Sequence, residues 1–323
     1  MNYKNLGNSG IKVSSLCLGT MTFGDGADAA MSKKIYQTSR DRGVNFFDCA
    51  NVYAKGESER ILGKLIYEHR DEVVITTKAY YPTGNTVNDR GLSRHHLTKE
   101  LNKSLKRLNT DYIDLYYMHC FDTETPLEES LSTLNDFVKQ GKIHYIGLSN
   151  FAAWQVMKAI SIVEKSNYEP ITCIQPMYSL LKRQCESELL PMAYSEKLGV
   201  TSYSPLGGGL LTGKYHNSNV DGRFKTSEMY QKRYDDEVTN KTVDRFIKFA
   251  MANDYDPVSL AIAWVSANQT ITAPIIGART VAQLEPALNS LTIEMTKELR
   301  DEISGFSLTP TLATDRKEEQ LST

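Results

Sequence analysis

Four polar side chains in this sequence are of the types that could deliver a proton to a carbonyl oxygen. Asp48 follows the apolar run VNFF, Tyr53 comes five residues later, Lys78 ends the run VVITT, and His119 follows IDLYYM. A lysine at the end of an apolar run is rarely found there unless it meets a carboxylate or a ligand. The sequence therefore predicts that these four residues meet at one site.

A nearby ammonium group would make Tyr53 a useful acid. Positive charge favours tyrosinate and would lower the pKa of Tyr53 from its free value of about 10. The phenol could then protonate a carbonyl oxygen near neutral pH, and His119 could orient that oxygen or help to move the proton. Each residue alone also has a structural interpretation, with Asp48 as a strand-end cap and His119 as a packed core histidine. The combination favours catalysis.

The elements that must position these residues follow from a repeat of short apolar runs and amphipathic stretches. The runs are SSLCLGT, VNFFDCA, VVITTKA, YIDLYYMH, YIGLSNF, TCIQPMY, VTSYSPL and TAPIIGA. Continuous apolar runs are typical of parallel strands that are buried on both faces. Eight strand–helix units in 323 residues predict one α/β domain over residues 1–323, a closed (β/α)₈ TIM barrel with right-handed crossovers. The active site of such a barrel lies at the carboxyl ends of the strands, where the four polar residues fall.

Three further segments complete the predicted barrel. YKNLGNSGIKVS reads as two short strands around a glycine-containing turn, a β-hairpin that could plug one end. A long loop follows the seventh strand, over roughly residues 207–240, and includes Arg223; a loop of that length is usually functional or mobile. Residues 309–323 are expected to form a frayed tail. Between the strands, the leucine spacing after Pro126 predicts a helix that Gly141 ends.

Composition narrows the class of protein. Lys+Arg is 37 and Asp+Glu is 39, so the net charge of 37 − 39 = −2 argues against general nucleic-acid binding. Hydrophobic residues at 41% and charged residues at 24% are typical of a folded globular chain. No secretory signal or long apolar stretch stands out, and the five cysteines lack a C-x-x-C spacing, so we expect reduced thiols and a cytoplasmic location without membrane contact. His95 and His96 are adjacent, without a further ligand pattern, and we expect them to be solvated and no metal to be bound.

The motifs around the four polar residues resemble those of the aldo-keto reductases. The resemblance rests on FFDCANVYAKGESERILG, TTKA and DLYYMH, followed by KIHYIGLSNF, CIQPMYSLL, SYSPLGGGLLTGKY and PIIGART. It runs from about residue 3 to about residue 300, in order and on consecutive predicted strands. It implies an NADPH-dependent reductase of aldehydes or ketones, in which Tyr53 is the general acid, Lys78 and Asp48 tune it, and His119 positions the substrate carbonyl.

The resemblance also implies a cofactor site without a Rossmann fingerprint. Its positions, from the nicotinamide to the adenine end, are Ser149, Asn150, Gln175, Tyr203, Ser204, Leu206, Gly208, Lys214, Arg279 and Gln283. The first three would bind the carboxamide, and Tyr203 would stack on the ring. The backbone from Ser204 to Gly208, helped by Lys214, would contact the pyrophosphate. Arg279 would bind the adenosine 2′-phosphate, which suits a planar guanidinium, so NADPH is favoured over NADH.

One position departs from the family pattern near the adenine. That pattern is Arg-x-x-x-Gln-Leu-x-x-Asn, and here the last position is Ala287, preceded by Pro286. The next asparagine, Asn289, is two residues late, and two helical residues turn a side chain by about 200°. Asn289 is therefore not expected to replace the missing amide, and Pro286 could delay or kink the helix.

A substrate pocket and two function classes remain as expectations. Apolar residues near the strand ends could wall a pocket for aldehydes with aromatic or aliphatic bodies, in preference to sugars. They are Met21, Phe23, Tyr80, Tyr81, Phe121 and Trp154. The potassium-channel β subunits resemble the same family, so a redox-sensing, nucleotide-binding regulatory subunit is the alternative to an enzyme. The sequence leaves the oligomeric state and the physiological substrate open.

Overall fold

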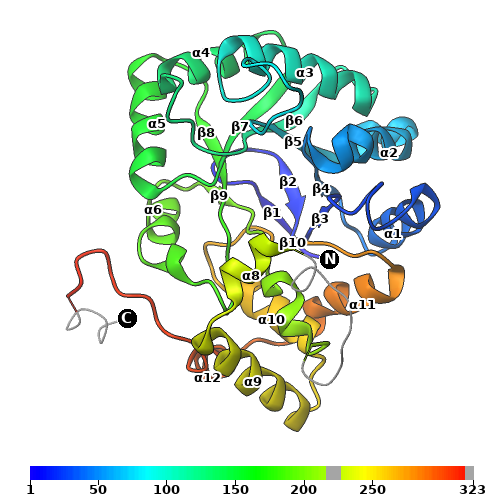
Figure 1. Ribbon diagram of the computed structural model, residues 1–323, viewed down its shortest axis with the longest axis vertical. Helices are drawn as coiled ribbons and strands as arrows, with labels where there is room; N and C mark the ends of the chain where they lie inside the picture. Colours follow the sequence, from blue (N-terminus) through cyan, green and yellow to red (C-terminus); the bar gives the residue numbers. More distant parts are fainter. Residues whose placement is uncertain (216–226, 317–323) are drawn as a thin grey trace.

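Eight short parallel strands form the centre of the computed structural model, which describes residues 1–215 and 227–316 (Figure 1). Their order is β10-β3-β4-β5-β6-β7-β8-β9. The strands are β3 (Cys17–Gly19), β4 (Phe46–Asp48), β5 (Val74–Ala79), β6 (Ile113–Met118), β7 (Ile143–Ser149), β8 (Ile171–Gln175), β9 (Gly199–Val200) and β10 (Ile275–Ile276). Backbone bonds from Thr272 N to Val200 O (2.9 Å) and from Ile275 N to Ser202 O (2.8 Å) join the two edges. The prediction of a (β/α)₈ barrel with all eight strands is confirmed.

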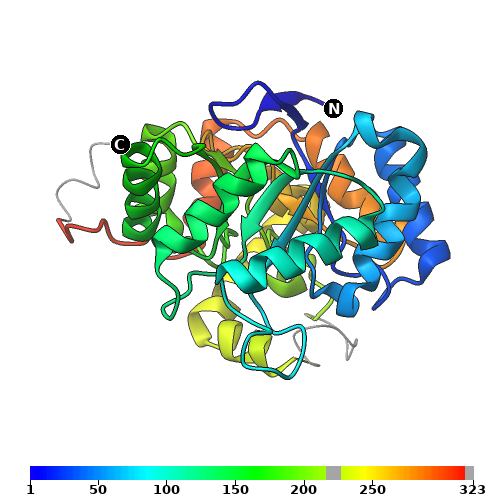
Figure 2. The same ribbon diagram turned by 90° about the horizontal axis from the view of Figure 1, so that it is seen from above.

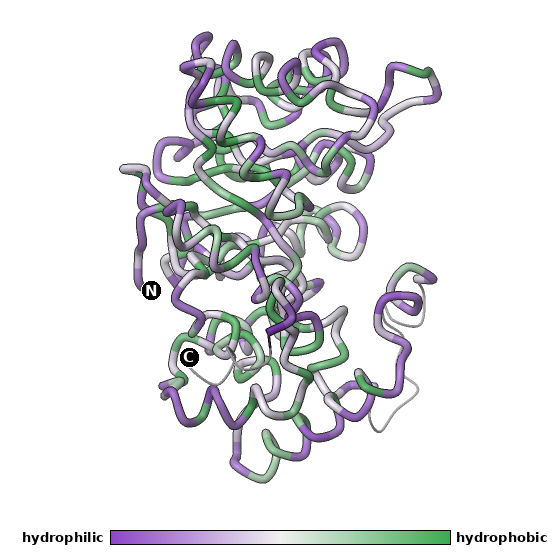
Figure 3. Tube along the Cα trace, turned by 90° about the vertical axis from the view of Figure 1, so that its left-hand side faces the viewer, coloured by the Kyte–Doolittle hydropathy of each residue, from purple (hydrophilic) through white to green (hydrophobic). Residues whose placement is uncertain are grey.

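Helices surround the strands and connect them. The α-helices are α1 (Ala29–Asp41), α2 (Glu57–Ile66), α3 (Arg94–Leu108), α4 (Leu127–Lys139), α5 (Ala153–Lys165), α6 (Leu189–Ser195), α8 (Glu228–Tyr234), α9 (Glu237–Ala252), α10 (Pro257–Ser266), α11 (Val281–Asn289) and α12 (Lys297–Ser304). Short 3₁₀ turns are η1 (Tyr53–Gly56), η2 (Tyr67–Glu72), η3 (Gln184–Glu186), η4 (Gly207–Thr212) and η5 (Ser290–Thr292). Hydrophobic residues predominate in the middle of the trace and hydrophilic ones are frequent at its periphery (Figure 3). Helix α4 confirms the helix predicted after Pro126.

The N-terminal hairpin closes one end of the barrel, as the sequence predicted. Strands β1 (Tyr3–Asn5) and β2 (Lys12–Ser14) pair antiparallel, and they lie at the end of the barrel opposite α8 (Figure 2). Leu6 and Val13 are fully buried and pack with Tyr117 and other side chains from inside the barrel. The turn passes so close to β9 that a Cβ at Gly7, whose φ is +58°, would collide with the backbone nitrogen of Gly199. Among the described residues, the end of the barrel at the carboxyl ends of the strands therefore stays uncovered by the hairpin.

The loop after the seventh strand is partly helical. The predicted insertion of residues 207–240 contains η4, α8 and the start of α9. Residues 216–226, with Arg223, lie outside the described residues, as do residues 317–323 of the predicted tail. Residues 309–316 form neither helix nor strand, although Ser187 Oγ donates a hydrogen bond to Thr311 O at 2.6 Å.

The cysteines and histidines give one agreement and one correction. All five cysteines are free, and Cys17, Cys49 and Cys173 are buried in the strand region. His95 is exposed as expected, but His96 is fully buried against the barrel, so its prediction as a solvated residue is wrong. Burial lowers the pKa of His96, which favours the neutral ring. In the two described ranges, no helix is long and apolar enough to cross a membrane.

Candidate active site

The barrel brings the four predicted catalytic residues to the carboxyl ends of three neighbouring strands. Asp48 ends β4, Lys78 lies one residue before the end of β5, and His119 directly follows β6. Tyr53 begins the 3₁₀ turn η1 in the loop after β4, and the next residue, Ala54, has a left-handed backbone with φ 47°. That backbone conformation is unfavourable for a non-glycine residue and marks a segment whose shape is imposed by its surroundings.

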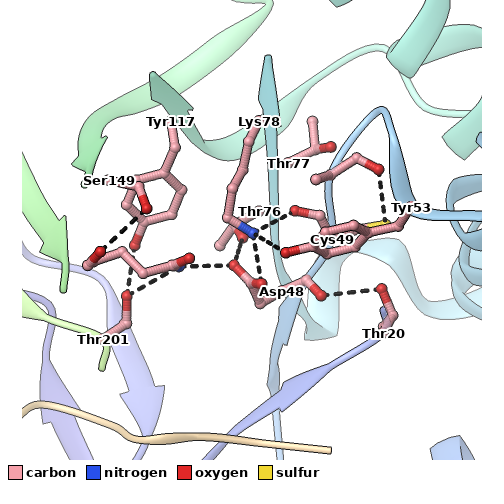
Figure 4. Close-up of polar contacts among 12 residues, drawn as sticks. Thr20, Asp48, Cys49, Tyr53, Thr76, Thr77, Lys78, Tyr117, Ser149 and Thr201 are labelled. Atoms are coloured by element: carbon pink, nitrogen blue, oxygen red, sulfur yellow. Dashed lines mark hydrogen bonds and ion pairs between the residues drawn. The ribbon is translucent and has the colours of Figure 1, made fainter. Parts of the chain in front are cut away.

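Lys78 is the centre of the cluster. Its side chain is fully buried, and Nζ donates to Asp48 Oδ2 at 2.6 Å, to Cys49 O at 2.7 Å and to Tyr53 OH at 3.4 Å (Figure 4). These contacts engage all three ammonium hydrogens. Burial alone would lower the pKa of Lys78, but the Asp48 carboxylate and the Tyr53 phenol raise it above its usual value. The ammonium therefore stays charged throughout the working pH range.

The other carboxylate oxygen of Asp48 accepts hydrogen bonds from side chains on β5 and β8. Asp48 Oδ1 accepts hydrogen bonds from Thr76 Oγ1 at 2.8 Å and from Gln175 Nε2 at 2.9 Å. Sequence reasoning missed Thr76, although it lies two residues before Lys78 on β5 and therefore shares its face. The bonds fix the carboxylate so that Oδ2 points at Lys78. Gln175 thereby belongs to the cluster around Lys78 as well as to the predicted cofactor site.

The predicted direction of the Tyr53 pKa is wrong for the chain as described. Removal from water raises the pKa of Tyr53 to about 12, and the Lys78 ammonium only partly opposes this rise. The sequence argument counted the cation and not the desolvation, which penalises the charged phenolate. At neutral pH Tyr53 is therefore a protonated phenol, which is the form that an acid needs.

His119 lies beside Tyr53 as a neutral ring. It is 9% exposed, and its Nδ1 has no hydrogen-bond partner among the described residues. Burial, followed by the positive charge of Lys78, lowers the pKa of His119 well below the usual 6.5. The ring is edge-on to Tyr53 and to Tyr81, with centroids at 6.1 Å and 4.8 Å. A neutral imidazole in this place can donate one hydrogen bond without introducing charge.

A cavity of about 780 Å³ runs from this cluster to α11. Asp48, Tyr53 and His119 line it, whereas Lys78 lies behind them and is fully buried. The ten residues predicted for the cofactor all line it as well: Ser149, Asn150, Gln175, Tyr203, Ser204, Leu206, Gly208, Lys214, Arg279 and Gln283. One continuous cavity thus joins Tyr53 to amide groups and to both cations predicted to bind phosphate, Lys214 and Arg279. This donor set suits a nicotinamide dinucleotide.

The amide end of the cavity is internally hydrogen-bonded. Asn150, whose φ is 57°, donates from Nδ2 to His119 O at 2.9 Å and accepts from Tyr203 OH at 2.8 Å. Ser149 Oγ donates to Gln175 O at 3.1 Å. The residues expected around the carboxamide are therefore tied to one another and to the backbone of His119, which fixes their positions relative to the acid.

At the predicted adenine end of the cavity, Ala287 stands where the family pattern has an asparagine. Helix α11 begins at Val281 in spite of Pro286, whose carbonyl accepts a bond from Ser259 Oγ at 2.7 Å. Ala287 lines the cavity, whereas Asn289 is exposed and accepts from Arg42 Nη2 at 3.5 Å. Asn289 is thus turned away, as expected. Gln283 Oε1 is already engaged by the backbone N–H of Arg279 at 3.0 Å.

Only part of the predicted aromatic wall reaches the cavity. Met21 and Tyr81 line it. Phe23 is fully buried in the core, and Tyr80 lies against Tyr81 (ring centroids 5.2 Å apart) without lining the cavity. Phe121 and Trp154 pack on each other at 5.9 Å outside it. The sequence places apolar residues near the strand ends but does not determine which of them turn toward the barrel axis.

Sequence reasoning also missed Val52, Met229, Tyr230 and Arg233, which line the cavity. The last three come from α8, beyond the reach of any strand-end argument. Among residues 1–215 and 227–316, no group of histidine, cysteine or carboxylate side chains could hold a metal ion.

The fold and the site together are those of a barrel oxidoreductase. Residues 15–307 match the model of the Aldo/keto reductase family, and the chain belongs to that family. It is 40% identical to the "Uncharacterized oxidoreductase YrpG" of Bacillus subtilis (strain 168) over 311 residues, 93% of this chain and 94% of that protein. It is 38% identical to a "Probable voltage-gated potassium channel subunit beta" of Oryza sativa subsp. japonica, over 94% of this chain and 96% of that one. The "Aldo-keto reductase AFTS1" of Alternaria alternata is 33% identical, over 92% and 89%.

The buried ion pair makes a prediction about stability. Lys78→Met would leave Asp48 charged and unpaired in the barrel, so we expect a loss of about 3–5 kcal/mol in the free energy of unfolding, measured in urea. Asp48→Asn/Lys78→Met removes both charges and should recover most of that loss. A double variant as unstable as the single one would contradict the assignment of the loss to an unpaired charge.

Proposed function

We propose that this protein is an NADPH-dependent reductase that converts aldehydes, and some ketones, to alcohols. The observation that carries the proposal is the bond from Lys78 Nζ to Tyr53 OH at 3.4 Å, beside the lined cavity. A protonated phenol next to a permanent cation is suited to give its proton to an oxygen that gains negative charge. We place the reaction in the cytoplasm, where the free cysteines of this chain stay reduced.

Each residue of the cluster has its own role in the reduction of the carbonyl group. Tyr53 donates its proton to the carbonyl oxygen, and Lys78, with Asp48 behind it, stabilises the phenolate that remains. His119 donates a hydrogen bond that orients the oxygen before transfer. When bound, the reduced nicotinamide supplies the hydride that the carbonyl carbon accepts. The alcohol thus gains its hydride at carbon and its proton at oxygen, and solvent later returns a proton to Tyr53.

The same cavity supplies the residues that would hold the cofactor. Ser149, Asn150 and Gln175 offer hydrogen bonds for the carboxamide, and Tyr203 offers an aromatic face. The backbone from Ser204 to Gly208 and Lys214 would bind the pyrophosphate. Arg279 is exposed at the far end, where a guanidinium suits the 2′-phosphate.

A regulatory subunit is the second candidate, because relatives named as probable potassium-channel β subunits match nearly the whole chain. The two functions differ in turnover. A reductase consumes NADPH, followed by absorbance at 340 nm, when a panel of aldehydes is added. A subunit of the second kind retains the nucleotide tightly and leaves its absorbance unchanged with every aldehyde.

The general acid is tested with Tyr53→Phe. Removing the proton donor should lower kcat for an aromatic aldehyde by roughly 10²–10⁴-fold, while the Kd for NADPH, measured by fluorescence, stays unchanged. Tyr67→Phe, at an exposed tyrosine outside the cavity, serves as the control and should keep turnover close to that of the wild type. Wild-type turnover by Tyr53→Phe would contradict the assignment.

The pKa directions predict the pH profile of reduction. Tyr53, with a pKa near 12, stays protonated up to alkaline pH, and His119, with its pKa well below 6.5, stays neutral above that value. A raised tyrosine pKa preserves the acid form and a lowered histidine pKa preserves the neutral form. We therefore expect kcat at saturating NADPH to be flat between about pH 6.5 and pH 9. A step near pH 6.5 that disappears in His119→Asn would show that His119 titrates there.

Cofactor preference is tested with Arg279→Ala. Loss of a charge-assisted bond to the 2′-phosphate should weaken NADPH binding by roughly 10- to 100-fold. NADH lacks that phosphate, so its Kd should change by less than about twofold. Equal losses for the two nucleotides would place the role of Arg279 elsewhere.

A further inference from the structure

The described lining of the cavity has more cationic than anionic side chains. Its lining in the described part of the chain includes three cationic side chains, Lys214, Arg233 and Arg279, and one carboxylate, Asp48. Asp48 is already paired with Lys78 at 2.6 Å. The walls of this concave site therefore favour anionic ligands. The proposed cofactor uses Lys214 and Arg279 for its phosphates and leaves Arg233 without a role.

Arg233 lies at the end of the cavity that holds the acid. It belongs to α8, which projects at the open end of the barrel (Figure 2). Burial raises the pKa of Tyr203 to about 12, and Arg233 opposes that rise; it also opposes the rise at Tyr81. Tyr81 packs edge-on against His119, with centroids 4.8 Å apart. Arg233 lines the same cavity as Tyr81 and Tyr203 and interacts electrostatically with both, so we assign it to the nicotinamide and substrate end, whereas Arg279 adjoins α11.

Three of the four carboxylates within five residues of Arg233 have partners of their own, and the fourth, Asp235, is exposed and forms no ion pair within residues 1–215 and 227–316. Glu228 pairs with Lys232 at 2.7 Å, and Asp236 caps α9 by accepting from Thr239 N at 2.8 Å. Within residues 1–215 and 227–316, Arg233 forms no ion pair with a carboxylate; its guanidinium lies 5.5 Å from the ring centroid of Tyr230. The guanidinium also hydrogen-bonds to the Tyr234 hydroxyl, and with five N–H groups it keeps further donors for a planar anion.

We propose that Arg233 binds a carboxylate on the substrate, so that the preferred substrates are aldehydes with an apolar body and a carboxylate remote from the carbonyl. The apolar body would contact Met21, Val52 and Met229, which also line the cavity. Arg233 would donate two parallel hydrogen bonds to the carboxylate while His119 and Tyr53 hold the carbonyl oxygen. This inference rests on the proposed reductase function.

The experiment compares charged and uncharged members of two aldehyde pairs. They are 4-carboxybenzaldehyde with its methyl ester, and 6-oxohexanoate with hexanal. The wild type should have the higher kcat/KM for the carboxylate in at least one pair. Arg233→Met should lower that value by roughly 10- to 100-fold, chiefly through KM, and should change the uncharged partner by less than about twofold. Lys232→Met, which removes an exposed cation from the same helix, is the matched control and should behave as the wild type.

Cofactor binding separates this role from a phosphate contact. The Kd for NADPH, measured by fluorescence, should be the same in Arg233→Met and in the wild type. Weaker NADPH binding, or equal losses for the charged and uncharged aldehydes, would overturn the anion site. A wild type that reduces all four aldehydes without preferring either carboxylate would overturn it too, while leaving the reductase function intact.

A chain that reduces none of the four aldehydes would contradict the reductase function itself. Calorimetry then tests the site directly, with 4-carboxybenzaldehyde titrated into the NADPH-loaded chain. Heat of binding that is lost in Arg233→Met and kept in Lys232→Met supports the anion site, and heat that does not depend on Arg233 overturns it.

Discussion

A fully buried ammonium group is the constraint on which the rest of the site depends. Lys78 has no contact with water, and a charge in such surroundings costs several kcal/mol unless it is paired and hydrogen-bonded. Three oxygens meet that requirement, from Asp48, Cys49 and Tyr53. Two of them come from β4 and the residue after it, so the parallel pairing of β4 with β5 also brings Lys78 to its partners.

The requirement extends beyond the immediate neighbours of Lys78. Asp48 can face the ammonium only because Thr76 and Gln175 hold its other oxygen, and Gln175 comes from β8, across the barrel. Gln175 also lines the cavity. A ligand that contacts Gln175 is therefore one hydrogen bond away from Asp48 and two from Lys78. The predicted cofactor site and the proposed proton donor are therefore parts of one polar network.

The sequence was sufficient for the fold, since each strand is a continuous apolar run and each of these runs contains a paired strand. It was also sufficient to bring Asp48, Tyr53, Lys78 and His119 together, because strand ends meet at one face of a barrel. Sequence reasoning failed for properties that depend on how deeply a side chain is buried. The pKa of Tyr53 depends on how much water is removed, and His96 is buried although its neighbour His95 is exposed. Phe23 and Tyr81 both lie a few residues after a strand. Phe23 is nevertheless buried in the core, whereas Tyr81 lines the cavity, because the backbone takes a different path in the two loops.

Charge and geometry divide the cavity into two unlike ends. Near Tyr53, the charge of Lys78 is neutralised by Asp48, and His119 is uncharged. The cluster around Lys78 therefore has no net charge of its own. At α11, by contrast, Ala287 offers no amide and Gln283 is engaged by the backbone of Arg279. Recognition at that end then depends on the charge of an exposed guanidinium. Exposed charges are screened by salt, whereas the buried pair is not. For the proposed reductase, nucleotide affinity should therefore depend on ionic strength far more than the proton-transfer step does.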